Sequence, residues 1–124
     1  MRILVVEDST LVQRMYGLAF SRRLHEMVMA ANGQEALDIL KSATSPFDLI
    51  LLDLRMPDMN GVDFLTALKQ RGGTPIPVVL VTAESDESPL VQRARQLGAA
   101  AVVHKPWKPT DLREVVRRVL PEVA

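Results

Sequence analysis

The sequence predicts an α/β domain: a doubly wound, five-stranded parallel sheet with helices on both faces. Two patterns indicate this class. Five short apolar runs recur along the chain, and each is followed by a longer segment whose apolar residues repeat every three or four positions. Each run is apolar at consecutive positions, which is typical of parallel strands covered by helices on both sides. Alternating strands and helices favour one parallel sheet with right-handed crossovers.

The expected strands are short and apolar throughout. They span residues 3–6, 27–31, 49–52, 78–81 and 99–103. The helix after the first strand is expected to bury one apolar stripe, formed by Leu11, Val12, Met15, Leu18 and Ala19.

Capping residues mark two of the expected helix starts. Ser9 or Thr10 can cap the first helix, and Thr110 followed by Asp111 can cap the last, because their side chains accept hydrogen bonds from free N–H groups. Gly61 is expected to permit a turn or a close backbone approach near the third helix.

The amino-acid composition excludes several classes of protein and of chemistry. Apolar residues make up 48% and charged residues 24% of the 124 residues, which is typical of a globular chain, and the length predicts one domain over residues 1–124. The 15 Lys and Arg balance the 15 Asp and Glu, and this zero net charge argues against direct binding to nucleic acid or an anionic membrane. The absence of cysteine excludes disulfides, thiolate metal sites and cysteine nucleophiles.

Targeting signals also bear on the expected location of the chain. No apolar run approaches the length that spans a bilayer. The first apolar run contains only four residues before acidic residues follow, which is too short for the core of a signal peptide. We therefore expect a cytoplasmic protein.

Polar residues follow four of the five expected strands. Glu7 and Asp8 end the first, Asp53 the third, Thr82 the fourth, and Lys105 the fifth. Because ligand sites of open parallel sheets lie outside the carboxyl ends of the strands, we expect these side chains to share one edge of the sheet. Their coincidence at four strand ends indicates a functional site more strongly than any one of them alone, since a single acid there is usually a cap or a solvated loop residue.

Three carboxylates in one small volume repel one another and need a compensating charge. A proton, a cation or Lys105 could supply it. Mg²⁺ suits a site with a few carboxylate oxygens and several retained waters. A carboxylate nucleophile, a metal, a hydroxyl and an ammonium can together accept a phosphoryl group.

The same residues resemble a known family. The segments VVEDS, DLILLDLRMPDMNG, PVVLVTA and VVHKPW are similar, in order and spacing, to the receiver domain of bacterial response regulators of the chemotaxis-regulator type. The resemblance covers essentially the whole chain. It implies a flavodoxin-like fold with strand order 2-1-3-4-5, an order for which the chemotaxis regulator is a standard example.

The resemblance implies specific roles for the acidic residues. Asp53 matches the aspartate that accepts the phosphoryl group. Glu7 and Asp8 match the acidic pair that holds Mg²⁺ together with Asp53, and the backbone carbonyl of Arg55 matches a further ligand.

The resemblance also implies a switch, with two departures. Thr82 matches the hydroxyl that moves toward the phosphoryl group, and Lys105 matches the lysine that pairs with it; its bond to Pro106 resembles the family's cis peptide. Val102 stands where the family often has Tyr or Phe, and His104 precedes the lysine where relatives are often apolar. We therefore expect a switch without an aromatic swing, signalled mainly by residues 83–97.

The resulting hypothesis is a phosphorylation-dependent switch rather than a turnover enzyme. It implies that a sensor histidine kinase or a phosphotransfer protein donates the phosphoryl group. The signal would then pass to a downstream effector protein or to a C-terminal output domain. A homodimer is also possible. One alternative is a phosphatase of the haloacid-dehalogenase type, but Arg55 occupies the position of its acidic residue. The other is an FMN-binding flavodoxin, whose phosphate Glu7 and Asp8 would repel.

Two further positions leave alternatives open. Arg55 and Glu84, each two residues past a site residue, could pair across the mouth of the site and limit the access of water, or could be solvated loop charges. Trp107 could pack in the core or contact a partner.

Overall fold

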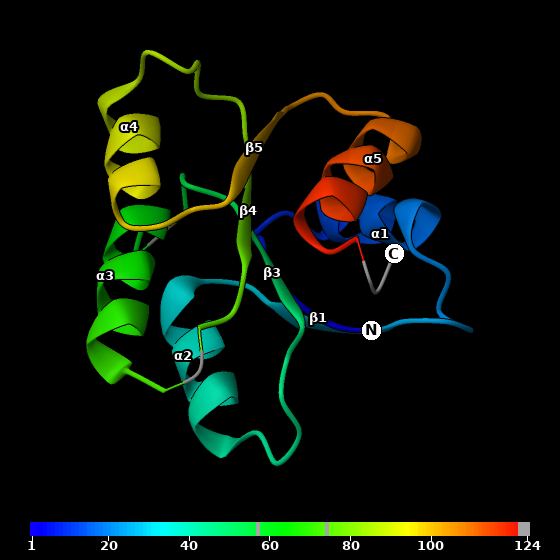
Figure 1. Ribbon diagram of the computed structural model, residues 1–124, viewed down its shortest axis with the longest axis horizontal. Helices are drawn as coiled ribbons and strands as arrows, with labels where there is room; N and C mark the ends of the chain where they lie inside the picture. The colour runs from blue at the N-terminus through cyan, green and yellow to red at the C-terminus, as the bar shows by residue number, and fades with distance from the viewer. Residues whose placement is uncertain (57, 74, 122–124) are drawn as a thin grey trace.

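Strands and helices alternate along the whole chain in the computed structural model, which describes residues 1–56, 58–73 and 75–121. The strands are β1 (Arg2–Val6), β2 (Glu26–Ala30), β3 (Leu49–Leu52), β4 (Val78–Thr82) and β5 (Ala101–His104). The helices are α1 (Thr10–Ala19), α2 (Gly33–Ser42), α3 (Gly61–Arg71), α4 (Pro89–Gln96) and α5 (Pro109–Val119) (Figure 1).

The five strands form one parallel sheet in the order β2-β1-β3-β4-β5. This confirms both the expected fold class and the order 2-1-3-4-5 that the family resemblance implied. The register places Val6 beside Ala30 and Leu52, and Thr82 beside His104, so the carboxyl ends of β1, β3, β4 and β5 lie along the same edge.

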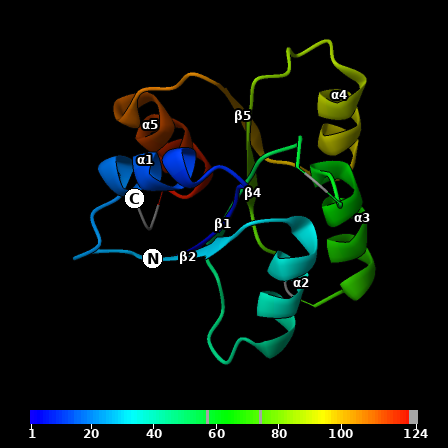
Figure 2. The same ribbon diagram turned by 180° about the vertical axis from the view of Figure 1, so that it is seen from behind.

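Helices cover both faces of the sheet. α1 and α5 lie on one face, and α2, α3 and α4 lie on the other, as both views show (Figures 1 and 2). Alternate residues of each strand enter the two cores: Leu4 and Ile50 face α2, α3 and α4, whereas Val5 and Leu51 face α1 and α5. Because both faces are covered, the central strands β1, β3 and β4 are buried at consecutive positions, except for Arg2 at the start of β1, whereas the edge strands β2 and β5 are only partly buried.

The expected stripe of α1 was partly wrong. Val12, Met15 and Ala19 pack into the core, but Leu11 and Leu18 are 68% and 71% exposed. The buried face centres on Tyr16, whose ring lies 5.1 Å from that of Trp107. The stripe therefore follows positions 12, 16 and 19, with Leu11 and Leu18 turned toward solvent.

Element ends differ from the expectations by one or two residues. β5 begins at Ala101, because the N–H of Ala99 still closes the end of α4 by donating to the carbonyl of Ala94. Ser9 caps α1 as expected, accepting a hydrogen bond from Val12. The expected cap at Thr110 was wrong: α5 begins at Pro109 with Lys108 as its N-cap.

Pro109 fits the first position of α5 because its missing N–H would have no helical partner there. Asp111 instead acts from inside this first turn, where its carboxylate accepts a hydrogen bond from the N–H of Lys108 at 3.4 Å. Among the described residues, no helix combines the length and the apolar character needed to cross a membrane.

Candidate functional site

The structure brings the residues expected at the strand ends to one edge of the sheet. Glu7 directly follows β1, Asp53 follows β3, Thr82 is the last residue of β4, and Lys105 follows β5. Ladder hydrogen bonds continue past the strand ends and hold these segments in place: the N–H of Asp53 donates to Val6 at 3.0 Å, and that of Lys105 donates to Thr82 at 2.8 Å.

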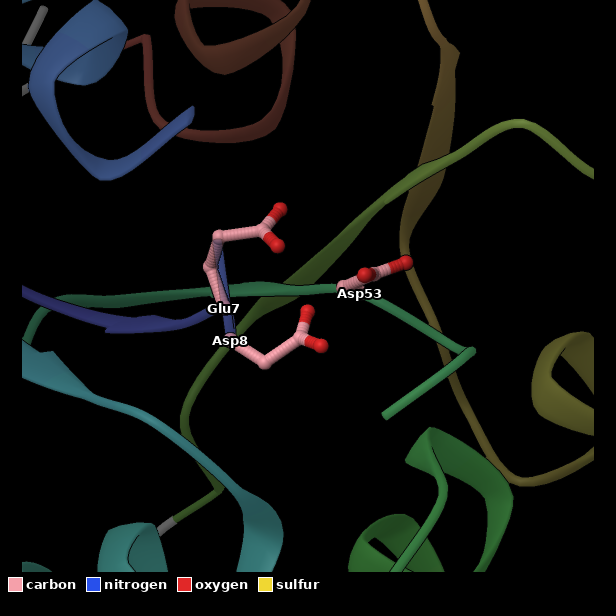
Figure 3. A group of neighbouring side chains, drawn as sticks. All are labelled: Glu7, Asp8 and Asp53. Carbon is pink, nitrogen blue, oxygen red and sulfur yellow. The ribbon is translucent and has the colours of Figure 1, made fainter. Parts of the chain in front are cut away.

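The carboxylates of Glu7, Asp8 and Asp53 form a compact acidic cluster. Each offers an oxygen, and these oxygens lie within 4.8 Å of one another. Glu7 and Asp53 are buried, whereas Asp8 is exposed. Figure 3 shows Glu7 and Asp8, from the end of β1, extending toward the side on which Asp53 lies. An all-oxygen donor set of this kind fits a hard divalent cation such as Mg²⁺.

Lys105 places a positive charge among these acids. Its Nζ donates to Glu7 Oε1 at 2.8 Å and lies 3.3 Å from Asp53 Oδ2. The other oxygen of Glu7 accepts a hydrogen bond from the N–H of Ser9 at 3.1 Å. The peptide bond between Lys105 and Pro106 is cis, as the resemblance implied.

The surroundings of the site raise the pKa values of Glu7, Asp53 and Lys105. Burial is the largest cause that raises the pKa of Glu7 and of Asp53; hydrogen bonds and charge from Lys105 oppose it without cancelling it. Burial tends to lower the pKa of Lys105, but its hydrogen bond to Glu7 and the charges of Asp53 and Glu7 outweigh this and raise it. The lysine therefore stays charged while the carboxylates hold protons more readily than exposed acids.

Gly61 lets α3 begin directly behind Asp53. A Cβ at this position would lie 2.8 Å from the carbonyl oxygen of Asp53 and 2.9 Å from the Cα of Leu54, closer than real Cβ contacts. The N–H of Gly61 donates to Leu54 at 2.9 Å. The expected close approach is therefore confirmed.

Thr82 connects the site to the loop that follows β4. Its hydroxyl is buried and accepts a hydrogen bond from the N–H of Glu84 at 3.0 Å. The Glu84 carboxylate forms an ion pair with the guanidinium of Arg55, and this contact lowers the pKa of Glu84. The N–H of Arg55 also approaches Asp53 Oδ1 at 3.4 Å. Of the two readings of Arg55 and Glu84, the structure therefore supports a pair.

The surroundings of two residues beside the site, His104 and Tyr16, were not predicted from the sequence. The ring of His104 contacts two groups of the loop after β4, a pairing across about twenty positions that leaves no local pattern. Tyr16 is fully buried, and its hydroxyl has no hydrogen-bond partner within the described part of the chain. Burial, followed by the charges of Glu7 and Asp53, raises the pKa of Tyr16. Its partner ring, Trp107, is buried as a packing residue.

Comparison with known proteins agrees with this arrangement. Residues 3–117 match the response regulator receiver domain. The chain belongs to this family. The receiver domain is 32% identical over 120 residues to sporulation initiation phosphotransferase F of Bacillus subtilis, covering 97% of this chain and 94% of that protein. It is also 36% identical over 118 residues to the transcriptional regulatory protein ResD of the same organism, covering 95% of this chain and 46% of ResD.

Solved structures support the same assignment. The receiver domain superposes on the chemotaxis protein CheY4 of Vibrio cholerae with a TM-score of 0.83 at 32% identity, covering 96% of this chain and 98% of that one. A CheY-like receiver domain protein from Methanospirillum hungatei gives a TM-score of 0.83 at 30% identity, covering 98% and 94%. These relatives favour a two-component signalling domain over the haloacid-dehalogenase-type phosphatase and the flavodoxin.

Proposed function

We propose that this receiver domain is a phosphorylation-dependent signalling switch in which Asp53 accepts the phosphoryl group. One observation carries the proposal most directly: the Asp53 carboxylate is buried at a strand end, 3.3 Å from the ammonium of Lys105 and within 4.8 Å of two further carboxylates. This environment offers a nucleophilic oxygen, cation ligands and a fixed positive charge in one place.

The proposed step transfers a phosphoryl group from a phosphohistidine of a sensor kinase or phosphotransfer protein. An oxygen of Asp53 forms the new bond to phosphorus, the bond between phosphorus and the donor's imidazole nitrogen breaks, and that nitrogen takes up a proton from solvent as the imidazole leaves. The product is an aspartyl phosphate that water later hydrolyses. The domain promotes only its own phosphorylation and dephosphorylation, so we do not class it as an enzyme.

Glu7, Asp8, Asp53 and the backbone carbonyl of Arg55 are the residues that would hold Mg²⁺. The compact set of carboxylate oxygens fits this ion. When bound, Mg²⁺ supplies positive charge that offsets the acids and the phosphoryl oxygens. Lys105 adds a second cation, which is free to hold a phosphoryl oxygen once it leaves Glu7.

Thr82 is the residue that we propose reports the phosphoryl group to the rest of the domain. Its hydroxyl accepts from the N–H of Glu84 and keeps its own hydrogen to donate, so a shift of Thr82 toward a phosphoryl oxygen on Asp53 would pull on this hydrogen bond. The loop after β4 would then adjust, which biases a two-state arrangement that a partner can read.

The partners and the setting follow from the same proposal. The donor is a sensor histidine kinase or a phosphotransfer protein, and the receiver of the signal is an effector protein or a C-terminal output domain. We place the domain, over residues 1–124, in the cytoplasm. Its zero net charge gives no basis for direct binding of nucleic acid or of an anionic membrane. Self-association as a homodimer is compatible with this function.

Intact-mass measurement after incubation with acetyl phosphate tests the proposal. The wild type should gain one phosphoryl group in the presence of Mg²⁺ and none after chelation. Asp53→Asn should gain none, whereas Asp38→Asn, which alters an exposed acid on α2, should behave as the wild type. Equal labelling of Asp53→Asn, or labelling that does not depend on Mg²⁺, would contradict it.

A further inference from the structure

The imidazole of His104 joins the end of β5 to the loop between β4 and α4. In this loop, residues 83–88, the carbonyl oxygen of Glu84 lies 3.0 Å from Nδ1 and the carboxylate oxygen Oδ1 of Asp86 lies 3.1 Å from Nε2. His104 follows Val102 by two positions on the same strand and stands beside Thr82 in the sheet. We call the contacts of His104 with Glu84 and Asp86 the His104 clasp.

Both partners of the ring are acceptors. A backbone carbonyl and an ionised carboxylate cannot donate, so each ring nitrogen must carry a hydrogen for both contacts to be hydrogen bonds. A neutral imidazole carries only one such hydrogen, whereas the protonated ring carries two. The complete His104 clasp therefore belongs to the protonated ring.

The charges around the ring come from three elements. Asp86, in the loop, faces Nε2 and also pairs with Arg95 of α4 at 3.6 Å. The carboxylate of Glu84 is paired with Arg55, so the carbonyl of Glu84 is what faces His104. Directly after β5, the ammonium of Lys105 pairs with the acids of the site.

Glu84 is held at three points by three different residues. Its N–H donates to the Thr82 hydroxyl, its carboxylate pairs with Arg55, and its carbonyl accepts from His104. Any movement of Thr82 that releases the N–H leaves Glu84 fixed by the other two contacts. The His104 clasp thus opposes displacement of the loop from the position seen in this structure.

We infer that His104 is a positioning residue, which holds the loop of residues 83–88 against the end of β5 in a manner that depends on pH. At low pH the protonated ring makes both contacts and the loop is held. At high pH the neutral ring can donate only one, and the loop opens more often. The effect of this clasp on phosphoryl transfer rests on the proposed function; its effect on the loop does not.

Hydrogen exchange on the unphosphorylated, Mg²⁺-free protein tests the inference. The readout is the protection factor of residues 83–88, which corrects for the intrinsic pH dependence of exchange. It is compared at about pH 5.5 and about pH 8, between which histidine side chains as a class can change charge. In the wild type, protection should be higher at the lower pH by about three- to tenfold, the effect of one hydrogen bond. β3 serves as the reference for global stability.

Three variants separate the clasp from a general effect. His104→Phe keeps a ring without donors, so the loop should lose protection and its pH dependence. Asp86→Asn removes the charge from an exposed loop residue and should shrink the pH dependence at least by about half without unfolding the domain. His25→Gln alters the other histidine of the chain and should retain the full wild-type effect.

A loop with equal protection at both pH values in the wild type would overturn the inference. So would a pH dependence in Asp86→Asn as large as that of the wild type, or one that disappears in His25→Gln. Because no phosphoryl group or metal is involved, these outcomes leave the proposal for Asp53 untouched, and failure of Asp53 to accept a phosphoryl group would leave the clasp untouched.

Discussion

The ammonium of Lys105 donates a hydrogen bond to the buried carboxylate of Glu7 across 2.8 Å, although the two residues are 98 positions apart in the chain. The lysine thereby engages one carboxylate of the acidic cluster that could hold a divalent cation. The ammonium of Lys105 and a bound cation would therefore compete for the negative charge of the same carboxylates, and each reduces the repulsion among them.

Removing this competitor should leave Mg²⁺ binding intact or strengthen it. In Lys105→Ala the affinity for Mg²⁺ should be unchanged or tighter, by up to about tenfold, the lower end of what a hydrogen bond to a charged group contributes. Phosphorylation, or its structural consequence, should weaken because the phosphoryl oxygens lose a charged partner. Titration calorimetry measures the affinity, and Lys41→Ala, on the exposed face of α2, controls for net charge. Markedly weaker Mg²⁺ binding by folded Lys105→Ala would contradict this placement of the lysine.

Mg²⁺ binding should depend on pH at values above the usual range for carboxylates. The pKa of Glu7 and of Asp53 is raised, chiefly by burial, and a metal binds only the deprotonated acids. Affinity should therefore fall as the pH is lowered through these raised pKa values, with protons released on binding. Calorimetry in buffers of different ionisation enthalpy counts these protons, and Asp53→Asn should release fewer. Affinity that stays flat until the ordinary carboxylate range would speak against buried, raised acids.

The raised pKa values of Glu7 and Asp53 also make the free energy of unfolding depend on pH. A carboxylate whose pKa is higher in the folded than in the unfolded chain binds protons more tightly when folded. Glu7 and Asp53 therefore lower the free energy of unfolding at neutral pH without metal, and this loss is recovered as the pH falls through their raised pKa values.

The pair formed by Arg55 and Glu84 should slow hydrolysis of the aspartyl phosphate, since water must pass near it to reach the phosphorus. In Arg55→Ala and in Glu84→Ala the phosphorylated form should decay faster by about two- to fivefold, a modest effect because the guanidinium is largely exposed. The double variant should show less than the sum of the two effects. Timed decay of the intact mass measures this. Unchanged decay in all three variants would make these residues solvated loop charges.

The buried hydroxyl of Tyr16 should contribute nothing to stability. It has no hydrogen-bond partner in the described part of the chain, so Tyr16→Phe should leave the free energy of unfolding unchanged or raise it by up to about 1 kcal/mol. Tyr16→Ala, which removes the ring that packs on Trp107, should cost about 3–5 kcal/mol. Denaturant unfolding compares the two. A loss above about 1 kcal/mol in Tyr16→Phe would indicate a hydroxyl that is bonded, for instance to water.

Strand positions could be predicted from the sequence because both faces of the sheet are buried, which leaves uninterrupted apolar runs. The order of the strands in the sheet could not be predicted in this way, because it depends on contacts between residues far apart in the chain. The family resemblance supplied that order. The buried face of α1 was misplaced because Leu11 and Leu18 fit a helical stripe as well as Tyr16 does, and only the packing of Trp107 selects between them.

The acids of the site were predictable because parallel strands bring their carboxyl ends together. A contact of Lys105 with one of the acids was also expected, but its choice of Glu7 and the contacts of His104 were not, because they depend on side-chain directions across 98 and about twenty positions. The start of α5 was misjudged for a local reason: Pro109 begins that helix one residue before the expected cap at Thr110.

The central claim, that a phosphoryl group on Asp53 changes the loop and helix after β4, is tested most directly by hydrogen exchange with beryllofluoride, which stands in for the phosphoryl group. With Mg²⁺ and beryllofluoride together, changes in protection should centre on residues 83–97, and Asp53→Asn should show none. Silence in that segment, or changes dominated by residues 99–105, would contradict the account.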